Sequence, residues 1–441
     1  MTTSVPRGDH PYPIRPVSSG EFDAFHTVDM HAFHGSPLSP EERQLVLSHL
    51  EFDRSLAAFD GDTPVGTAGA YTFQLTVPGS AALPAAGVTW VSVLPSHRRR
   101  GVLSSLMRRQ LADVRDRGEP LAVLWASESV IYPRFGYGRA MWHADFTLYR
   151  GEGTLARTAP VAGAAPAAGT APADGGLRLR LVDPVAAIPE LAKVYDAVLP
   201  SRPGFIARTE SWWQRTVYDP ADRRQGTSPL HCVLADDGGG PRGYALYSAV
   251  NRWDSDTSLP DSVLNVREMV AADAAASAAL AADLLSRDLT MEFRLRGRPV
   301  DDPLLYQLAD PRRARPRLKD ALWVRIIDVP GALARRRYSA PADVVLEVRD
   351  DLLPANAGRW RLTTTGSAAP DGAGLSATCA PSGSAPDVLL DVTQLGAAYL
   401  GGTTLSALAG AGLVTEGRPG AVRQLSTALS WDPAPWCPVN F

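Results

Sequence analysis

A short basic turn, His97-Arg98-Arg99-Arg100-Gly101, lies between a run of apolar, largely β-branched residues and a helical pattern. The N–H groups of a first helical turn have no partner within the helix and carry a partial positive charge. The guanidinium groups add charge there, and a glycine lets a ligand approach the backbone closely. Three arginines alone are more often a solvated surface. Their position between a predicted strand and a predicted helix favours an anion site suited to a pyrophosphate.

Two motifs together resemble a known family. The spacing Arg99-Arg100-Gly101-Val-Leu-Ser104 resembles the acyl-CoA pyrophosphate loop of the GNAT acetyltransferase superfamily. The segment Ala126-Ser-Glu-Ser-Val-Ile-Tyr-Pro-Arg-Phe-Gly-Tyr-Gly138 closely resembles the run that follows this loop in the Eis ("enhanced intracellular survival") family. Members of that family are multi-domain GNAT aminoglycoside acetyltransferases. Either motif alone is weak, whereas the two together are specific.

The resemblance implies a set of site residues. Tyr132 matches the family's general-acid tyrosine, and Phe441 matches the C-terminal residue whose carboxylate serves as base. Trp90 is expected to form an aromatic wall of the acceptor pocket, with Phe33 beside it. No metal is expected, and the cosubstrate is acetyl-CoA. The residues expected to bind it are Val91, Ser92, Val93, Arg99, Arg100, Gly101, Val102, Leu103, Ser104, Ser127 and Glu128.

Both catalytic roles agree with elementary acid–base chemistry. A phenol with a pKa near ~10 is protonated at neutral pH and can donate to a departing thiolate, whose conjugate acid has a pKa near ~8.5. A terminal carboxylate, with a pKa near ~3.5, becomes a better base when burial raises that value. The competing interpretations are a structural tyrosine at position 132, a frayed terminus at 441, and Tyr137 as the acid. We interpret Tyr137 as a packing residue.

The acceptor side of the predicted site departs from the family. Aminoglycosides are polycations, and the family's acceptor pocket is rich in acidic residues, including one near the C-terminus. Here the penultimate residue is Asn440. Four acidic residues of the N-terminal helical region could compensate. They are Asp23, Asp29, Glu41 and Glu42.

Hydrophobic periodicity predicts the elements that position these motifs. Apolar residues at helical spacing predict helical structure over residues 21–50 and a helix at 102–114. The strands expected in the first domain cover residues 55–60, 65–73, 88–94, 121–125 and 142–149. By resemblance, strands 88–94 and 121–125 should splay apart and admit the pantetheine arm of the cosubstrate.

The same order of elements then repeats. A helix near residues 191–199 precedes strands at 232–235, 244–250 and 263–270, a helix at 274–285 and a strand at 290–295. The position of the basic turn is taken by Ala271-Ala-Asp-Ala-Ala-Ala276, which has no arginine or glycine. This repeat predicts a duplicated fold that lost its anion site.

The chain is therefore expected to be an α+β protein, with an active GNAT fold, a degenerate GNAT-like fold and, by resemblance, a sterol-carrier-protein-like domain. The predicted divisions are 1–150 for the catalytic domain, 151–176 for an Ala/Pro/Gly linker, 177–315 for the degenerate domain and 316–441 for the last. In the last domain we expect strands at 344–348, 360–364 and 388–392 and a helix at 404–408.

Composition excludes several classes of protein. The chain has 44 basic and 47 acidic residues and a formal charge of −3, which argues against nucleic-acid binding. Its three cysteines are widely spaced, which predicts neither a disulfide framework nor a zinc site. There is no long apolar run and no signal-peptide pattern, so we expect a soluble cytoplasmic protein without membrane contact.

These observations predict an acetyl-CoA-dependent N-acetyltransferase. Its acceptors would be primary amines of small polyamines such as aminoglycosides, or of lysine-bearing peptides, and the resemblance also implies a homo-hexamer. Two alternatives stay open. One is a lipid or sterol carrier acting through the last domain. The other is a twin-GNAT acyltransferase with a larger acyl group.

Overall fold

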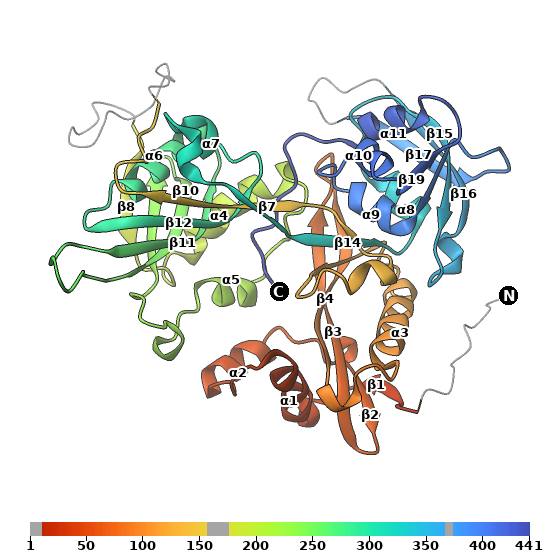
Figure 1. The fold of residues 1–441 in the computed structure, drawn as a ribbon, viewed down its shortest axis with the longest axis horizontal. Coiled ribbons are helices and arrows are strands. Elements are labelled where there is room, and N and C mark those ends of the chain that lie inside the picture. Colours follow the sequence, from red (N-terminus) through yellow and green to blue (C-terminus); the bar gives the residue numbers. More distant parts are fainter. Residues whose placement is uncertain (1–10, 157–175, 367–373) are drawn as a thin grey trace.

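Three mixed β-sheets, each with its own helices, make up the protein (Figure 1). The structure is a computed structural model that describes residues 11–156, 176–366 and 374–441. Each of the three parts combines a mixed sheet with helices, which is the predicted α+β class. No helix within these ranges is long and apolar enough to cross a membrane.

The first sheet holds both motifs identified in the sequence. Its strands, in spatial order, are β1 (Ile14–Pro16), β2 (Leu56–Asp60), β3 (Thr63–Thr76), β4 (Ala82–Val93), β5 (Leu121–Trp125), β14 (Leu322–Ile326) and β6 (Gly138–Arg139). Its helices are α1 (Phe22–Phe33), α2 (Pro40–Leu47) and α3 (Val102–Asp116). The helical region predicted over residues 21–50 is thus two helices. His34 ends α1 with a φ of 55°, and Ser39 caps α2 with Pro40 in its first turn.

The helix α3 lies on the first sheet through one apolar face. Val102, Leu106 and Leu111 are almost wholly buried and recur at helical spacing. Gly66 of β3 permits this close approach, because a Cβ there would lie 2.6 Å from a methyl group of Val102. The sheet therefore fixes the position of the turn that precedes α3.

The second sheet repeats this plan. Its strands, in spatial order, are β13 (Arg317–Asp320), β7 (Trp142–Tyr149), β12 (Thr290–Pro299), β11 (Ser262–Ala271), β10 (Pro241–Val250), β9 (His231–Asp236) and β8 (Arg178–Val182). Its helices are α4 (Ile188–Val198), α5 (Glu210–Val217), α6 (Ala274–Leu285) and α7 (Leu304–Gln307). In both sheets the strand before the long helix pairs in parallel with the strand after it, as β4 does with β5 and β11 with β12.

The third part is a five-stranded sheet with four helices. The strands, in spatial order, are β17 (Ser376–Pro381), β16 (Gly358–Thr365), β15 (Asp343–Arg349), β18 (Val388–Asp391) and β19 (Val414–Glu416). The helices are α8 (Val329–Arg335), α9 (Val392–Ala398), α10 (Leu405–Gly410) and α11 (Ala421–Leu429).

Two strands lie in a sheet other than the one expected from their place in the sequence. Strand β7 was expected in the first domain, and it pairs with β12 and β13 of the second sheet. Strand β14 was expected at the start of the last domain, and it pairs with β5 and β6 of the first sheet. Alternation of apolar residues reports which faces of a strand are buried and not which strand is its neighbour. The division of the chain into domains at residues 150 and 315 remains a prediction.

The predicted linker, residues 151–176, falls mostly outside the described residues. The part that is described, up to Ala156, is attached to the second domain. Leu155 forms an isolated β-bridge with Leu308, and Glu152 makes ion pairs with Arg313 and Arg315.

Buried apolar residues join the three parts. One contiguous cluster contains Leu121 of the first sheet, Leu246 of the second and Leu346 of the third. A buried ion pair adds a specific link, because Arg325 of β14 donates to Asp350 at 2.7 Å and neither side chain is more than 1% exposed. The sheets therefore pack as parts of one molecule.

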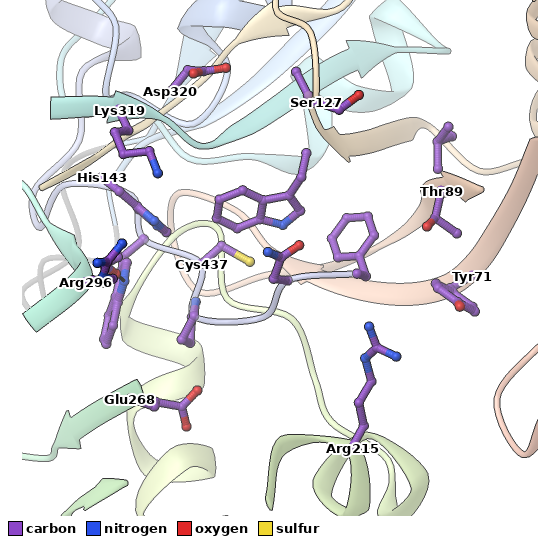
Figure 2. A pocket seen from close by; sticks show the side chains of 18 of the residues that line it. Tyr71, Thr89, Ser127, His143, Arg215, Glu268, Arg296, Lys319, Asp320 and Cys437 are labelled. Carbon is purple, nitrogen blue, oxygen red and sulfur yellow. Dashed lines mark hydrogen bonds between the residues drawn. The ribbon is translucent and has the colours of Figure 1, made fainter. Parts of the chain in front are cut away.

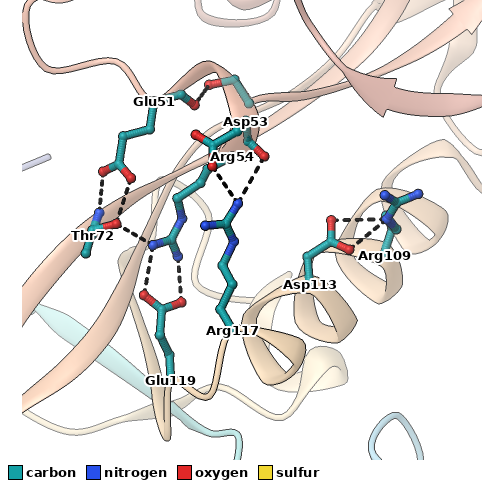
Figure 3. A network of polar contacts seen from close by, with 9 residues as sticks. Glu51, Asp53, Arg54, Thr72, Arg109, Asp113, Arg117 and Glu119 are labelled. Atoms are coloured by element: carbon teal, nitrogen blue, oxygen red, sulfur yellow. Dashed lines mark hydrogen bonds and ion pairs between the residues drawn. The ribbon is translucent and has the colours of Figure 1, made fainter. Parts of the chain in front are cut away.

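A network of polar contacts fixes the base of the first sheet (Figure 3). The Arg54 guanidinium donates to both carboxylate oxygens of Glu119, at 2.8 and 2.7 Å, and to the Thr72 hydroxyl. Glu51 accepts from the backbone N–H and the hydroxyl of Thr72. The network ties the turn before β2 to β3 and to the loop after α3.

Candidate active site

Strands β4 and β5 separate beside the basic turn. Their parallel pairing runs from Ala85 and Leu121 to Val88 and Leu124, and beyond this point β4 pairs only with β3. A bulge accompanies the separation, and Trp90 there has a φ of 52°. The backbone of β4 beyond Val88 thus has no strand partner on the β5 side, which is the predicted splay.

A groove of about 330 Å³ begins at this opening and runs to the start of α3. Gly101 stands at the N-cap of this 15-residue helix with a φ of 83°, and no side chain of the described residues caps it. Unpaired amide N–H groups and guanidinium groups therefore meet at one end of the groove. The predicted cosubstrate residues that line it are Val91, Ser92, Val93, Arg99, Gly101, Val102, Leu103, Ser104, Ser127 and Glu128.

Arg100 differs from the other predicted cosubstrate residues. Its guanidinium donates to the Tyr12 hydroxyl at 3.0 Å, and it is not among the residues that line the groove. Arg98, which we did not single out, does line the groove. Consecutive residues of a turn point in different directions, so the sequence could not tell which arginines face the ligand.

A second cavity, of about 880 Å³, adjoins the groove (Figure 2). The first sheet, the second sheet and the C-terminal segment all contribute to its wall. Four residues line both spaces, so the groove and the cavity meet there. These residues are Phe33, Val91, Ser127 and Tyr132. Trp90 and Phe441 line the cavity alone.

Tyr132 lies at this junction, at the start of a short 3-10 helix (Tyr132–Phe135). Burial raises the pKa of Tyr132 to about 12, and the Ser127 hydroxyl beside it partly offsets that rise. Tyr137, the competing tyrosine, is wholly buried 6.0 Å away between ring centroids, and it lines neither space. Its hydroxyl has no hydrogen-bond partner among the described residues. The structure thus agrees with a packing role for Tyr137.

The C-terminal segment is held between the first two sheets. The indole N–H of Trp125 on β5 donates to the Val439 carbonyl at 2.9 Å. The indole N–H of Trp436 donates to the Gly297 carbonyl on β12 at 2.8 Å. The ring of Phe441 packs edge-on against Phe73, with centroids 4.9 Å apart. These contacts bring residue 441 into the same cavity as Tyr132.

One of the four acidic residues named from the sequence lines the cavity. Asp29 of α1 accepts a hydrogen bond of 2.7 Å from the Ser92 hydroxyl, and burial raises the pKa of its carboxyl group. Glu41 is not among the lining residues, and the other two are in ion pairs outside the cavity. Asp23 pairs with Arg43 at 3.0 Å and Glu42 with Arg223 at 2.8 Å.

Sequence analysis missed the contribution of the second domain to this cavity. Glu268, Asp145 and Asp320 all lie in its wall. Glu268 is buried and paired with Arg208 at 2.5 Å, and the Tyr244 hydroxyl donates to it. The sequence around Glu268 has the pattern of an ordinary buried strand. Nothing in that pattern indicates that the Glu268 carboxylate faces a cavity.

The equivalent helix start in the second domain is occupied by a side chain of the protein itself. The Asp273 carboxylate accepts from the Ala276 N–H at 2.8 Å and pairs with Arg242 at 2.8 Å. A carboxylate at this position takes the place that a phosphate would need. The predicted loss of the second anion site has this physical basis.

The fold and the site define a class of protein, a tandem GNAT acetyltransferase with a C-terminal sterol-carrier-like domain. The Acetyltransferase (GNAT) domain families match residues 13–140 and 204–326, and the Sterol carrier protein domain family matches residues 329–438. The chain belongs to the Eis family of N-acetyltransferases. It is 32% identical over 407 residues to the N-acetyltransferase Eis of Mycobacterium tuberculosis. The matched region covers 90% of this chain and 91% of that protein.

Two further relatives extend this result. An uncharacterized N-acetyltransferase of Streptomyces avermitilis is 42% identical over 428 residues, or 97% of this chain and 99% of that one. The crystal structure of Eis1 from Mycobacterium abscessus superposes with a TM-score of 0.79 at 34% identity, covering 97% of this chain and all of that one. GNAT acetyltransferases use acetyl-CoA, and the groove at α3 brings helix N-terminal amides together with arginine side chains.

Proposed function

We propose that the protein transfers the acetyl group of acetyl-CoA directly to a primary amine, with Tyr132 as the acid and the main-chain carboxylate of Phe441 as the base. One observation carries this proposal. Tyr132 lines both the groove and the cavity, and Phe441 lies in the same cavity although it is 309 residues away in the sequence.

The groove supplies the residues that would hold the cosubstrate. The N-terminal amides of α3 and the Arg98 and Arg99 side chains line one end, where a pyrophosphate would bind. The backbone of Val91 to Val93 lines the other end, where β4 leaves β5. Bound there, acetyl-CoA supplies an acetyl thioester beside Tyr132.

Tyr132 would hold a proton at its hydroxyl oxygen. Its pKa, raised to about 12 by burial, keeps the phenol protonated throughout the neutral range. The hydroxyl can therefore donate a hydrogen bond, and then a proton, to negative charge that develops on a sulfur atom.

Two carboxylates would serve the amine. The Asp29 carboxylate can attract a cationic ammonium group into the cavity, and the Phe441 carboxylate can accept the proton that the amine loses. Each is better suited to proton transfer in a partly enclosed site than in open water. Small polyamines, aminoglycosides among them, and lysine-bearing peptides are the first acceptors to assay.

A short C-terminal extension tests the base. Adding two glycine residues after Phe441 moves the main-chain carboxylate while keeping every side chain, so kcat should fall by about 10²-fold or more. The same two glycines at the N-terminus are the control. CoA release with a panel of amines is the measurement, and unchanged turnover with the C-terminal extension would rule out the carboxylate. The predicted homo-hexamer stays a prediction that light scattering can check.

A further inference from the structure

Three side chains of the second sheet gather at one end of the cavity (Figure 2). His143 lies on β7, and Lys319 is directly opposite it on β13, so the two share a face of the sheet. Arg296 lies in a bulge of β12, where the register with β7 shifts between Leu295 and Arg298. We call His143, Arg296 and Lys319 the basic cluster.

The two cations of the basic cluster have no counterion in the described part of the chain. Among the described residues, no carboxylate lies within ion-pair distance of Arg296 or Lys319, although both side chains line the cavity. Their cationic neighbour Arg298 differs, because it pairs with Asp302 at 2.7 Å. The lysine is also notable by composition, since Lys193 and Lys319 are the two lysines in a chain with 44 basic residues.

Three other acidic residues of the same wall have hydrogen-bond or ion-pair partners in the protein. Asp145 accepts the Gly297 N–H at 2.9 Å, and Asp320 accepts the Trp323 indole N–H at 2.9 Å. Glu268 is held by Arg208. A further cation, Arg215 of α5, lines the cavity without an ion pair to any described residue. Arg215, Arg296 and Lys319 are thus the cations of the cavity wall that have no ion pair among the described residues.

His143 adds a neutral polar ring to the wall beside these cations. Its side chain is buried, with 6% of the residue exposed, and Nε2 has no hydrogen-bond partner among the described residues. Burial lowers the pKa of His143 to about 4, so the ring is neutral at pH 7 and can donate or accept one hydrogen bond.

We propose that the basic cluster binds an anionic oxygen group of the acceptor. Given the proposed acetyl transfer, the acceptor is then an amine that also carries a carboxylate or phosphate-like group, and not a pure polycation. Its anionic end lies against Arg296, Lys319 and His143, and its ammonium end faces Asp29 and Tyr132. A polycation would instead bring further positive charge to Arg296 and Lys319, which lack ion pairs among the described residues.

Matched acceptors test this proposal. L-lysine and 1,5-diaminopentane differ by one carboxylate, and ω-amino acids of increasing length, with the corresponding aminoalkyl phosphonates, show which anion and which span fit best. We expect kcat/KM to be at least about tenfold higher for the anionic member of a pair, as one charge-assisted hydrogen bond would give. CoA release measures both members under the same conditions.

Variants connect the preference to the cluster. Lys319→Gln and Arg296→Gln should each raise KM for the anionic acceptor about tenfold, while kcat/KM for the dication 1,5-diaminopentane should not fall. Both side chains are exposed, so the fold should tolerate the change. Lys193→Gln on α4, which removes the same charge outside the cavity, should change neither value.

The outcomes separate this proposal from the proposed function. Equal kcat/KM for the two members of each pair, with silent cluster variants, would overturn the anion site and leave acetyl transfer standing. Absence of CoA release with every amine would overturn acetyl transfer instead. Calorimetric titration of L-lysine into the wild-type protein and Lys319→Gln then still tests the cluster, because weaker binding to the variant supports it and equal binding refutes it.

Discussion

Tyr132 and Tyr137 lie five residues apart in one motif, but they differ in their surroundings. Both rings are buried, and burial raises both pKa values. Only the Tyr132 side chain lines the groove and the cavity. Access, and not acidity, distinguishes the two phenols as candidate acids.

Removal of each hydroxyl in turn gives a matched comparison. Tyr132→Phe should lower kcat by about 10²-fold or more, because it deletes the proposed proton donor. KM for acetyl-CoA should change little. Tyr137→Phe deletes a hydroxyl without a partner among the described residues, so turnover should stay within about twofold. Steady-state CoA release decides, and similar losses in both variants would contradict the assignment.

The raised pKa of Tyr132 also predicts a pH dependence. The phenol is the proton donor below its pKa, so activity that depends on it is present at neutral pH and lost as the pH rises through about 12. An acid with an ordinary tyrosine pKa near ~10 would begin to lose activity near pH 9. We therefore expect kcat to show no alkaline decline up to pH 10. A decline centred near pH 9 would point to another acid.

Tyr132 and the basic turn could be predicted from the sequence because each belongs to a local motif. The sequence did not identify His143, Glu268 or Arg296, which reach the cavity from strands of the second sheet. The alternation of residues in a strand indicates which side chains are buried. It does not indicate which side chains at the end of a strand lie next to a cavity. The acidic candidates near α1 could not be ranked either, because helix periodicity does not say that Asp29 alone faces inward.

At the scale of elements, the network around Arg54 has a clear stability consequence (Figure 3). The Arg54 and Glu119 side chains are 3% and 6% exposed, so removing one charge leaves the other buried without its partner. Such a change costs about 3–5 kcal/mol. Glu119→Gln should therefore lower the midpoint of thermal unfolding by several degrees at least.

The same network contains its own control. Arg117 and Asp53 form an exposed pair, with side chains 42% and 68% exposed, and exposed pairs contribute about 0–1 kcal/mol. Asp53→Asn should thus shift the midpoint of the calorimetric transition much less than Glu119→Gln. Equal shifts would mean that the buried pair adds no more than a surface contact.

Most elements near the site could be predicted. Strand β5, strand β7 and helix α6 have the predicted bounds, because each has a clear apolar period and a flanking turn or cap. The break between α1 and α2 was not predicted, although Gly35 and Pro37 in the connection and the Ser39-Pro40 cap of α2 are signals for it. Hydrophobic periodicity also does not predict which strands pair with each other.

At the scale of the whole molecule, the first two sheets each contain a strand from the other side of residues 157–175. Strand β7 precedes that segment and lies in the second sheet, whereas β14 follows it and lies in the first. Both strands bury large side chains, such as Phe146 and Leu148 of β7. Cutting the chain within the segment should therefore leave two fragments joined through both sheets.

A protease site inserted between residues 160 and 170 tests this expectation. After cleavage, the two fragments should co-elute on size exclusion and retain acetyltransferase activity. A protein with a protease site in the turn at Asp237–Gly240 of the second sheet, cut in the same way, controls for the effect of a nick itself. Separation of the fragments without denaturant would contradict the strand exchange.

The plan of three parts could be anticipated from the internal repeat and from the resemblance to the Eis family, and the domain families confirm it. The cavity could not be predicted from the sequence, because it forms where the first two sheets and the C-terminal segment meet. Contacts between residues hundreds of positions apart, such as Trp125 with Val439, leave no local pattern in a single sequence.

Three of the ten tryptophans, Trp90, Trp125 and Trp436, line the acceptor cavity. Their indole rings surround the space in which an amine would bind, so its arrival should alter their fluorescence. The protein thus carries an intrinsic optical reporter of occupancy. Acceptors can be ranked by titration in the absence of any reaction, with the seven remaining indoles as a constant background.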